Sequence, residues 1–557
     1  MIQNKKEAIA SPAEIPPNTE NCLTFDDILV YVGEFGRYQK CLFCCMIPFE
    51  FIWCTVYLSQ IFTILVPDHW CRIPELSSLS KEDQLKLAIP NGDSKKDFDR
   101  CRMYDVNYTQ LLEDNVSIAD KDWPKKHCND WVYDKKQVPY DTIAMQYNWV
   151  CDDYALGAYT VTIYFVGSIV GAIIFGYTTD HCGRIPALML ANTCGLVGGV
   201  LSAFCKGFST FAGARFVVGM AYDYCCTPIY ILIMEIVGPK YRTFITQFTI
   251  AVFFTPIACL LPWLAILCND WRIFTLATSI PIACALILYF AISESPRWLI
   301  SAGKIDKGMA IIRKAAKRNG KNIPEDVLVP FEKCCHLIYA KEQTRNQNTV
   351  IDLFRTWRRC RITFILILIW MITSLVYDAH VRIITDLGPD IFITFSVACT
   401  TELPAGLLPL FLLDVVGRRN MTFAVFIICA IGSLAAGFLE NIWLVATAAI
   451  IGRFGATIAY NIGLQWAAEI LPTVVRGQGV ALVHIMGFVA SLMSPLVVYL
   501  EHYSKIAPMM IISGLSIIAV ILAIFLPETK NIELPQTLQD AESMWNGHKM
   551  FTCGSRR

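Results

Sequence analysis

Long apolar stretches recur along almost the whole chain, and they constrain its fold more than any other feature. A helix needs about 20 mostly apolar residues to cross a membrane, and we count twelve such stretches between polar connections. The pattern predicts an all-α membrane protein. The expected spans are 41–66, 154–176, 187–206, 208–235, 243–268, 271–292, 361–383, 387–412, 421–440, 442–468, 478–500 and 507–526.

The composition of the 557 residues agrees with a membrane protein. Hydrophobic residues make up 55% of the chain and charged residues 17%, whereas about a quarter of a soluble protein is charged. The formal net charge is zero, so no global field indicates a nucleic acid or an anionic surface as partner. Residues 1–40 lack the features of a cleaved signal peptide, so the first span is expected to act as the membrane signal.

Two long connections predict the orientation of the spans. Segment 297–361 holds 15 Lys and Arg against 6 Asp and Glu, and segment 68–153 holds 12 against 17. Cytoplasmic loops favour Lys and Arg, so the central segment and both termini are expected in the cytoplasm and the 68–153 loop outside, as in a plasma-membrane protein. The expected parts are an N-terminus (1–40), a six-helix bundle with the loop (41–292), a linker with amphipathic helices (293–360), a second bundle (361–526) and a tail (527–557).

The 68–153 loop carries features of an extracellular segment. It contains two glycosylation sequons, which begin at Asn107 and Asn115. An even set of cysteines suits two disulfides, although four cysteines allow three pairings. The remaining cysteines lack metal-ligand spacing and are interpreted as small buried apolar residues, so we expect neither a metal nor a cofactor. The four loop cysteines are Cys71, Cys101, Cys128 and Cys151.

Three charged motifs occur twice, once in each half of the chain, at the ends of corresponding spans. They are Asp-x-x-Gly-Arg, Glu-x6-Arg, and a Glu-containing turn after the sixth and twelfth spans. Such charges can pair across the cytoplasmic face and form a gate that breaks when that side opens; the alternative is that they only cap helices and mark topology. The proposed gate residues are Asp180, Gly183, Arg184, Glu235, Arg242, Glu294, Arg297, Asp414, Gly417, Arg418, Glu469, Arg476 and Glu528.

These motifs resemble the major facilitator superfamily, and further segments resemble its organic cation, anion and carnitine transporter family. The additional segments are 25–40 before the first span, Pro67-Asp-His-Trp-Cys71 after it, and 526–538 near the end of the chain. The resemblance implies twelve helices in two six-helix repeats that rock about a central site in alternating access. It also implies a transporter and not an enzyme, with a small organic ion as partner.

Four acidic residues within spans suggest where a substrate binds, because an ionisable group in a membrane by default marks a functional site. They are Glu50, Asp223, Asp378 and Glu402, and the search finds no equally central Lys or Arg. This excess favours a cationic or zwitterionic substrate. The alternative for each acid is pairing with polar neighbours or a place at a wet helix rim.

The resemblance adds further candidates for the pathway. Tyr230, Tyr377 and Asn461 match pathway positions of the family, and aromatic faces there can hold an alkylammonium. Phe488 stands where family members carry a charge that distinguishes cation carriers from anion or carnitine carriers, so subgroup specificity cannot be transferred. Asp223 likewise replaces a lysine that is typical of some cation carriers.

The resulting hypothesis is a carrier of small organic cations. No phosphate-binding Gly-x4-Gly-Lys-Ser/Thr loop is present, so uniport driven by the membrane potential is the simplest energy source. His380 and His484 could titrate near neutral pH, although packing is the more common role of such residues. The basic segment 304–321 is expected to form an amphipathic helix near membrane lipid.

Two alternatives remain open from the sequence. A carnitine-like zwitterion or an organic anion could be the substrate if Arg382 reaches the cavity, but the sequence favours a place at the outer rim for this residue. A non-transporting receptor or scaffold is the alternative from another class. The duplicated gate motifs speak against it, because a static protein has no use for them.

Overall fold

The chain packs into two compact units in the computed structural model. The smaller comprises Met1–Leu42, Leu232–Arg242 and Ser293–Asn346, and the larger comprises Phe43–Ile231, Thr243–Ile292 and Gln347–Arg557. The predicted bounds of the two six-helix bundles stay a prediction. The structure describes residues 23–91, 98–114, 116, 118–120, 122–288, 292–344, 349–385, 387–530, 532, 535, 538–539 and 541–542.

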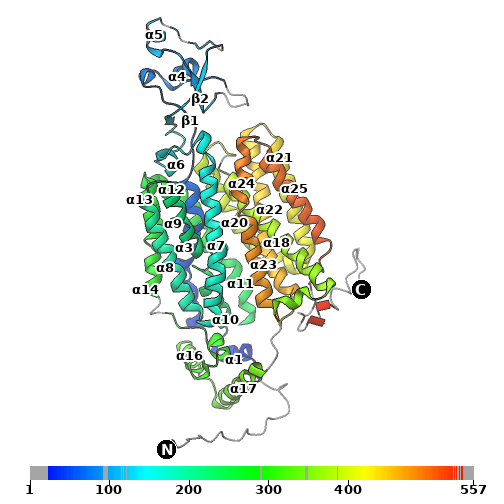
Figure 1. Cartoon of the computed structure of the whole chain (residues 1–557). Helices are drawn as coiled ribbons and strands as arrows, with labels where there is room; N and C mark the ends of the chain where they lie inside the picture. The colour runs from blue at the N-terminus through cyan, green and yellow to red at the C-terminus, as the bar shows by residue number, and fades with distance from the viewer. Residues whose placement is uncertain are drawn as a thin grey trace, which may run out of the picture. The chain divides into compact units, whose positions relative to one another are not determined.

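Helices account for most of the described residues (Figure 1). Among those residues, nine helices are long and apolar enough to cross a membrane, and they match nine of the twelve expected spans. They are formed by α2 (Arg37–Cys44) with α3 (Ile47–Thr63), η3 (Cys151–Asp153) with α7 (Ala155–His181), α8 (Arg184–Ala203), η4 (Ile250–Phe254) with α12 (Thr255–Cys268), α18 (Trp357–Ile383), α19 (Ile391–Thr400) with α20 (Glu402–Val416), α21 (Arg418–Phe438), α22 (Ile442–Ile470), and α23 (Arg476–Ser491) with α24 (Ser494–Tyr499) and η7 (Leu500–His502).

The other three expected spans are also helical, but they are interrupted or shorter. Span 208–235 consists of α9 (Phe208–Ala221) and α10 (Thr227–Ile236), and Pro228 lies at the start of α10. Proline lacks the amide hydrogen that a continuous helix needs, which explains breaks of this kind. Pro281 separates the two helices of span 271–292 in the same way. The helices concerned are α13 (Trp271–Ser279) with α14 (Ile282–Ile287), and α25 (Ala507–Ala523).

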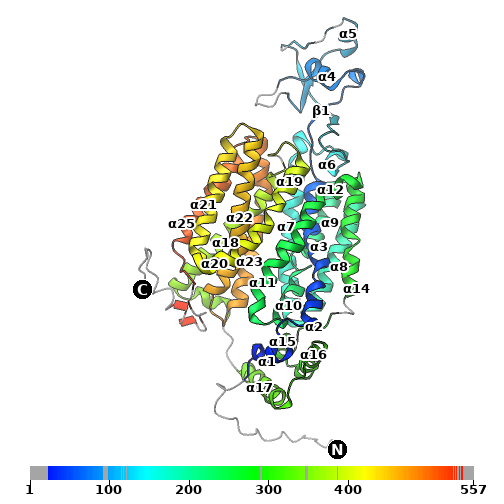
Figure 2. The same ribbon diagram turned by 180° about the vertical axis from the view of Figure 1, so that it is seen from behind.

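The helices of the larger unit pack side by side, and one pair of them is in direct backbone contact. Figures 1 and 2 show α21, α22 and α25 side by side, and α18 packs on α22 and α23. Helix α7 meets α9 through glycines: a Cβ on Gly167 would lie 2.1 Å from the carbonyl oxygen of Phe216, and one on Gly219 would lie 2.0 Å from that of Tyr164. Small residues let helix backbones approach closely in membranes, and here only glycine fits.

The 68–153 loop folds around its own small apolar core, which includes Trp70, Leu76 and Leu87. Two antiparallel pairs of strands stabilise it, β1 with β4 and β2 with β3. Asn107 is exposed at the N-cap of α5, as a glycosylation site requires, whereas Asn115 lies outside the described residues. The elements are β1 (His69–Cys71), η2 (Pro74–Leu76), α4 (Lys81–Ala88), β2 (Arg102–Tyr104), α5 (Tyr108–Glu113), β3 (Lys125–His127), β4 (Trp131–Tyr133) and α6 (Ile143–Gln146).

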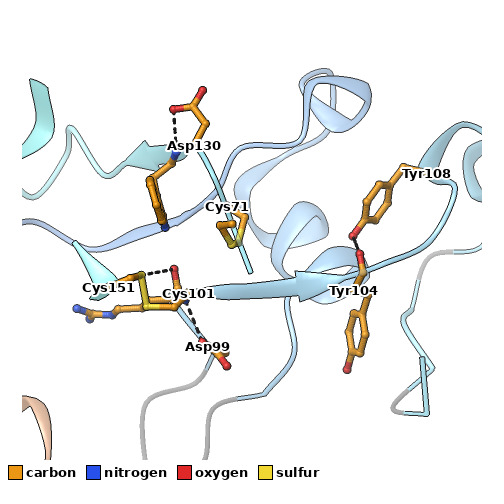
Figure 3. Close-up of a disulfide and its surroundings, with 10 residues drawn as sticks. Cys71, Asp99, Cys101, Tyr104, Tyr108, Asp130 and Cys151 are labelled. Atoms are coloured by element: carbon orange, nitrogen blue, oxygen red, sulfur yellow. Dashed lines mark hydrogen bonds between the residues drawn. A yellow bond between two sulfur atoms is a disulfide. The ribbon is translucent and has the colours of Figure 1, made fainter. Parts of the chain in front are cut away.

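The four loop cysteines form two interleaved disulfides. Cys71 pairs with Cys128, and Cys101 pairs with Cys151, with Cα atoms 5.4 and 5.6 Å apart. Figure 3 shows Cys101 and Cys151 joined beside Asp99, whose carboxylate accepts the amide hydrogen of Cys101 at 2.9 Å. The structure thus selects one of the three pairings that the sequence left open.

One polar residue after the end of α16, Asn319, connects several parts of the smaller unit. The side chain of Asn319 accepts the amide hydrogen of Tyr38 at 2.8 Å and donates to the carbonyl of Val32 at 2.9 Å. It thereby ties the turn between two N-terminal helices to the end of a third. The helices of this unit include α1 (Phe25–Val32), α15 (Pro296–Ser301), α16 (Ile305–Arg318) and α17 (Glu325–Thr344); α11 (Pro239–Thr249) and η6 (Val350–Phe354) complete the chain.

Candidate functional site

The repeated charged motifs of the C-terminal half converge on Arg418. Its guanidinium lies 3.0 Å from a carboxylate oxygen of Glu469 and 2.9 Å from Asp414. Glu528 accepts the backbone amide hydrogen of Arg418 at 2.9 Å, and a Cβ on Gly417 would lie 2.6 Å from that same carboxylate. Three motifs that are separate in the sequence therefore form one ionic network, and the Glu528 carboxylate leaves no space for a side chain at Gly417.

The matching motif of the N-terminal half has a looser ion pair. Asp180 and Arg184 lie 4.0 Å apart, and the Asp180 side chain is mostly exposed. Gly183 adopts a positive φ of 115°, as Gly417 does at 93°, a conformation that glycine adopts at little cost. In the C-terminal half, Arg476 of the Glu-x6-Arg motif donates a hydrogen bond to the backbone carbonyl of Leu471 at 3.2 Å.

Four further gate candidates lie in the smaller unit. Arg242 lies 2.6 Å from a carboxylate oxygen of Asp26, and Arg297 lies 3.8 Å from the same oxygen. Asp26 therefore joins the two N-terminal motifs, a contact that the sequence did not predict. Glu235 and Glu294 belong to the same unit.

Glu402 occupies the start of α20 and is 2% exposed. The sequence predicted this acid as a binding residue, and the structure surrounds it with partners. Its Oε1 atom lies 3.2 Å from Nη2 of Arg453 and accepts hydrogen bonds from the hydroxyls of Tyr377 and Thr457, at 3.3 and 3.4 Å. Arg453 is 1% exposed and lies over the ring of Phe395. Glu402 is therefore part of a buried ion pair.

Asp223 lies in the turn between α9 and α10, where the helix is interrupted. Its carboxylate is 3.3 Å from Nε2 of His484 on α23. The ring of His484 contacts Phe488 edge-on, with centroids 4.7 Å apart. Phe488 thus packs against a group that can carry charge, although it carries none itself.

The other two predicted acids have weaker charged surroundings. Asp378 on α18 is 4% exposed and accepts a hydrogen bond from the hydroxyl of Tyr57. Glu50 on α3 is 2% exposed and accepts from the thiol of Cys226 at 3.4 Å. Among the described residues, the second carboxylate oxygen of Glu50 has no hydrogen-bond partner.

A continuous series of aromatic rings connects these acids. We call this series the aromatic wall. Three acids adjoin it, because Tyr377 contacts Glu402, His484 contacts Asp223 and Tyr57 contacts Asp378. Consecutive ring centroids are between 4.7 and 6.1 Å apart. The series runs through Tyr377, Tyr460, Trp370, His484, Phe488, Tyr222 and Tyr57.

Two predicted pathway residues and one histidine have simpler surroundings. Tyr230 is partly buried on α10, and the side-chain amide of Asn461 donates to the carbonyl of Ala405 at 3.4 Å. His380 is fully buried and bonded to Ser433 at 3.0 Å, so it is a packing residue.

The structure corrects the prediction that the spans hold no central basic residue. Arg215, Arg382 and Arg453 are 3%, 8% and 1% exposed. Arg215-Phe216 and Arg453-Phe454 occur in corresponding spans of the two halves, so the internal repeat that revealed the gate motifs could also have revealed these arginines. The four acids within the spans therefore do not by themselves establish an excess of negative charge.

Arg382 lies one residue before the end of α18, on the loop side as the sequence indicated, but it is buried there and not exposed at a rim. It lines a cavity of about 140 Å³ at the ends of α3, α7, α18 and α24 that adjoin the 68–153 loop. We call this the loop-side cavity. Its other lining residues include Thr385, Tyr154, Tyr499 and Pro495.

Comparisons with known proteins identify the family. Residues 132–537 match the family described as sugar (and other) transporter. The chain belongs to this transporter family. It is also 31% identical to the human organic cation/carnitine transporter 2, with 92% of this chain and 93% of the relative covered. A match at this level places the transporter in the organic cation and carnitine transporter branch.

A second relative and a solved structure agree with this assignment. The transporter is 32% identical to organic cation transporter 1 of Caenorhabditis elegans, over 93% of this chain and 88% of the relative. The inward-open xylose transporter XylE from E. coli has a TM-score of 0.60 at 15% identity, over 90% of this chain and 100% of that chain. The latter likeness shows the major facilitator fold alone, and so confirms the predicted fold class.

Proposed function

We propose that this transporter moves small organic cations across the membrane by alternating access. The observation that carries the proposal is the aromatic wall that joins Glu402, Asp223 and Asp378 within one packed unit. Aromatic faces attract alkylammonium groups, and nearby carboxylates offset the cost of removing a cation from water. The names of the relatives, which include organic cations, support the same substrate class.

Asp223 is the carboxylate best suited to meet the substrate. Glu402 already has Arg453 as its counter-ion, whereas Asp223 has only a histidine, which is charged only when protonated. A substrate ammonium can replace His484 at Asp223. Glu50, Tyr230, Asn461 and Phe488 complete the proposed pathway.

The proposed gate and energy source follow from the same architecture. The ionic network around Arg418 closes the cytoplasmic side of the transporter, where the charged motifs lie, and must open in each transport cycle. For a monovalent cation, the membrane potential contributes about 2.3 kcal/mol per 100 mV, so electrogenic uniport needs no coupled ion.

We also propose the topology that the charge distribution predicts. Both termini lie in the cytoplasm, the 68–153 loop lies outside, and the protein resides in the plasma membrane. The exposed Asn107 side chain makes this testable. Glycosidase treatment should lower the apparent molecular mass of the protein isolated from cells. The Asn107→Gln variant should show a smaller decrease in mass.

The decisive experiment is uptake of labelled tetraethylammonium into voltage-clamped cells, with Asp223→Asn as the test variant and Glu113→Gln, an exposed loop residue, as the matched control. Close charge pairs in binding sites have coupling energies of about 1.5 kcal/mol or more, so losing the charge of Asp223 should raise KM at least tenfold in Asp223→Asn. Inward current should grow with inside-negative potential. Absence of uptake in the wild-type protein at the cell surface would refute the proposal.

A further inference from the structure

We propose that the loop-side cavity is a binding site for zwitterions, in which Arg382 holds a carboxylate and the rings of Tyr154 and Tyr499 receive an alkylammonium group. The inference rests on the proposed function, because it specifies which organic ions the transporter prefers. It concerns residues that are distinct from the aromatic wall described above.

The first support is the unused hydrogen-bonding capacity of Arg382. Its Nε and Nη2 atoms are buried and have no hydrogen-bond partner among the described residues. The residue is only 8% exposed and borders the cavity. A buried charge without a partner is costly, so these N–H groups are the kind that a ligand satisfies. A guanidinium matches the two oxygens of a carboxylate in particular.

The second support is the balance of charge around the cavity. Arg382 and Arg215 lie over neighbouring rings of α7, those of Phe165 and Tyr164, each at 5.4 Å. Asp378, one helical turn before Arg382, attracts it electrostatically, but it lies beyond ion-pair distance and accepts hydrogen bonds from Tyr57 and Ser491. No carboxylate lies within 4.0 Å of Arg382 in the described part of the chain. The guanidinium groups of Arg215 and Arg382 repel each other, so an anionic group bound at Arg382 would offset positive charge that Asp378 only partly balances.

The third support is the lining of the cavity. Tyr154 and Tyr499 have ring centroids 5.9 Å apart and border the same space as Arg382. Aromatic surface attracts an alkylammonium, while Thr385 supplies a hydroxyl. The volume of about 140 Å³ is well above the roughly 15 Å³ that one water molecule needs on the same measure. The cavity thus offers an anion contact, a cation contact and space for a short linker.

The test compares uptake of a labelled trimethylammonium carboxylate with uptake of its methyl ester, which keeps the cation and loses the anion. In the wild-type transporter, kcat/KM should be higher for the zwitterion. In Arg382→Gln the ratio of the two kcat/KM values should fall about tenfold or more, since a hydrogen bond to a charged group is lost. Arg382→Lys should lower the ratio by less, because the charge remains and only the planar fork is lost.

The control variant is Arg355→Gln, which removes an exposed arginine outside the cavity and should leave the ratio unchanged. An unaltered ratio in Arg382→Gln and Arg382→Lys would overturn the inference, as would wild-type uptake of the ester without the zwitterion. In that last case the proposed cation transport would still stand. Wild-type uptake of neither compound would refute both proposals.

Discussion

Two of the buried arginines in the larger unit, Arg453 and Arg382, have contrasting surroundings. Arg453 lies over Phe395 at 5.8 Å and has Glu402 at 3.2 Å. Arg382 lies over Phe165 at 5.4 Å but has no carboxylate within ion-pair distance, and it faces a cavity. The same side chain is therefore neutralised by the protein at one place and left for a ligand at the other.

The difference teaches how to separate structural charge from functional charge in a membrane protein. Removing one member of a buried ion pair leaves its partner uncompensated, whereas a buried charge that already lacks a partner loses nothing of this kind when it is removed. The two arginines should consequently respond to mutation in opposite ways.

The largest expected effect is on stability at the paired site. Arg453→Gln should destabilise the purified transporter by about 3–5 kcal/mol, because Glu402 is left buried and charged. Arg382→Gln should leave the melting temperature equal or higher. Thermal unfolding in detergent, followed by the fraction of protein that stays monodisperse, measures both.

The double variant Glu402→Gln/Arg453→Gln provides the control for this comparison. It removes both charges and should recover most of the lost stability. Equal losses for Arg453→Gln and Arg382→Gln would end the distinction between a paired and an unpaired arginine.

A smaller effect is expected from the residue that keeps Asp378 away from Arg382. Tyr57→Phe removes the hydroxyl that donates to Asp378 and leaves Ser491 as its hydrogen-bond partner, so the carboxylate can pair more closely with Arg382. Preference for the zwitterion over its ester should then fall several-fold, up to about tenfold. Uptake ratios as in the Arg382 experiment would measure this, and an unchanged preference would mean that Asp378 does not compete for Arg382.

The aromatic wall should respond without discriminating between the two compounds. Tyr460→Leu removes a ring between Tyr377 and Trp370. A cation–π contact contributes about 0.5–2 kcal/mol, so KM should rise about two- to thirtyfold for the zwitterion and the ester alike. Tyr460→Phe keeps the ring and serves as control. A change confined to the zwitterion would place carboxylate recognition here and not at Arg382.

The smallest effect concerns the 68–153 loop, where the ion pair of Lys81 and Asp134 is less buried than either arginine. Although partial burial acts in the opposite direction, the hydrogen bond from Lys81 holds the pKa of Asp134 below its ordinary value of 3.8. A lowered pKa stabilises the folded loop above that value, and the contribution is lost as the pH falls through the lowered pKa. Proteolysis of the loop should therefore accelerate slightly in acid, and Asp134→Asn should remove that part of the pH dependence.

Much of the fold could be predicted because its signals are local. The apolar stretches located nine helices long enough to cross a membrane and three helical segments that are shorter or interrupted, and the duplicated Asp-x-x-Gly-Arg motif led to the network at Arg418. The proline-linked break beside Asp223 was not predicted, since an apolar stretch looks the same whether its helix is continuous or interrupted.

The charge arrangement was harder to predict because pairing depends on contacts between distant residues. Glu402 and Arg453 are 51 positions apart, and a search for acids alone found only one of them. The disulfide pairing was equally open, since all three connectivities satisfy the same spacing. Arg382 was expected at the rim because it lies near the end of a span, and only the neighbouring helices show that a cavity reaches it.

The glycine contacts between α7 and α9 have a mechanical consequence. Two backbones that touch directly have no flexible side chains between them that could change rotamer. These two helices should therefore move together as one rigid body. Hinge or shear movement has to occur where side chains separate the helices, as between α7 and α23 or between α12 and α19. A methyl group added at Gly219 would force α7 and α9 apart, although Gly219 belongs to none of the charged motifs.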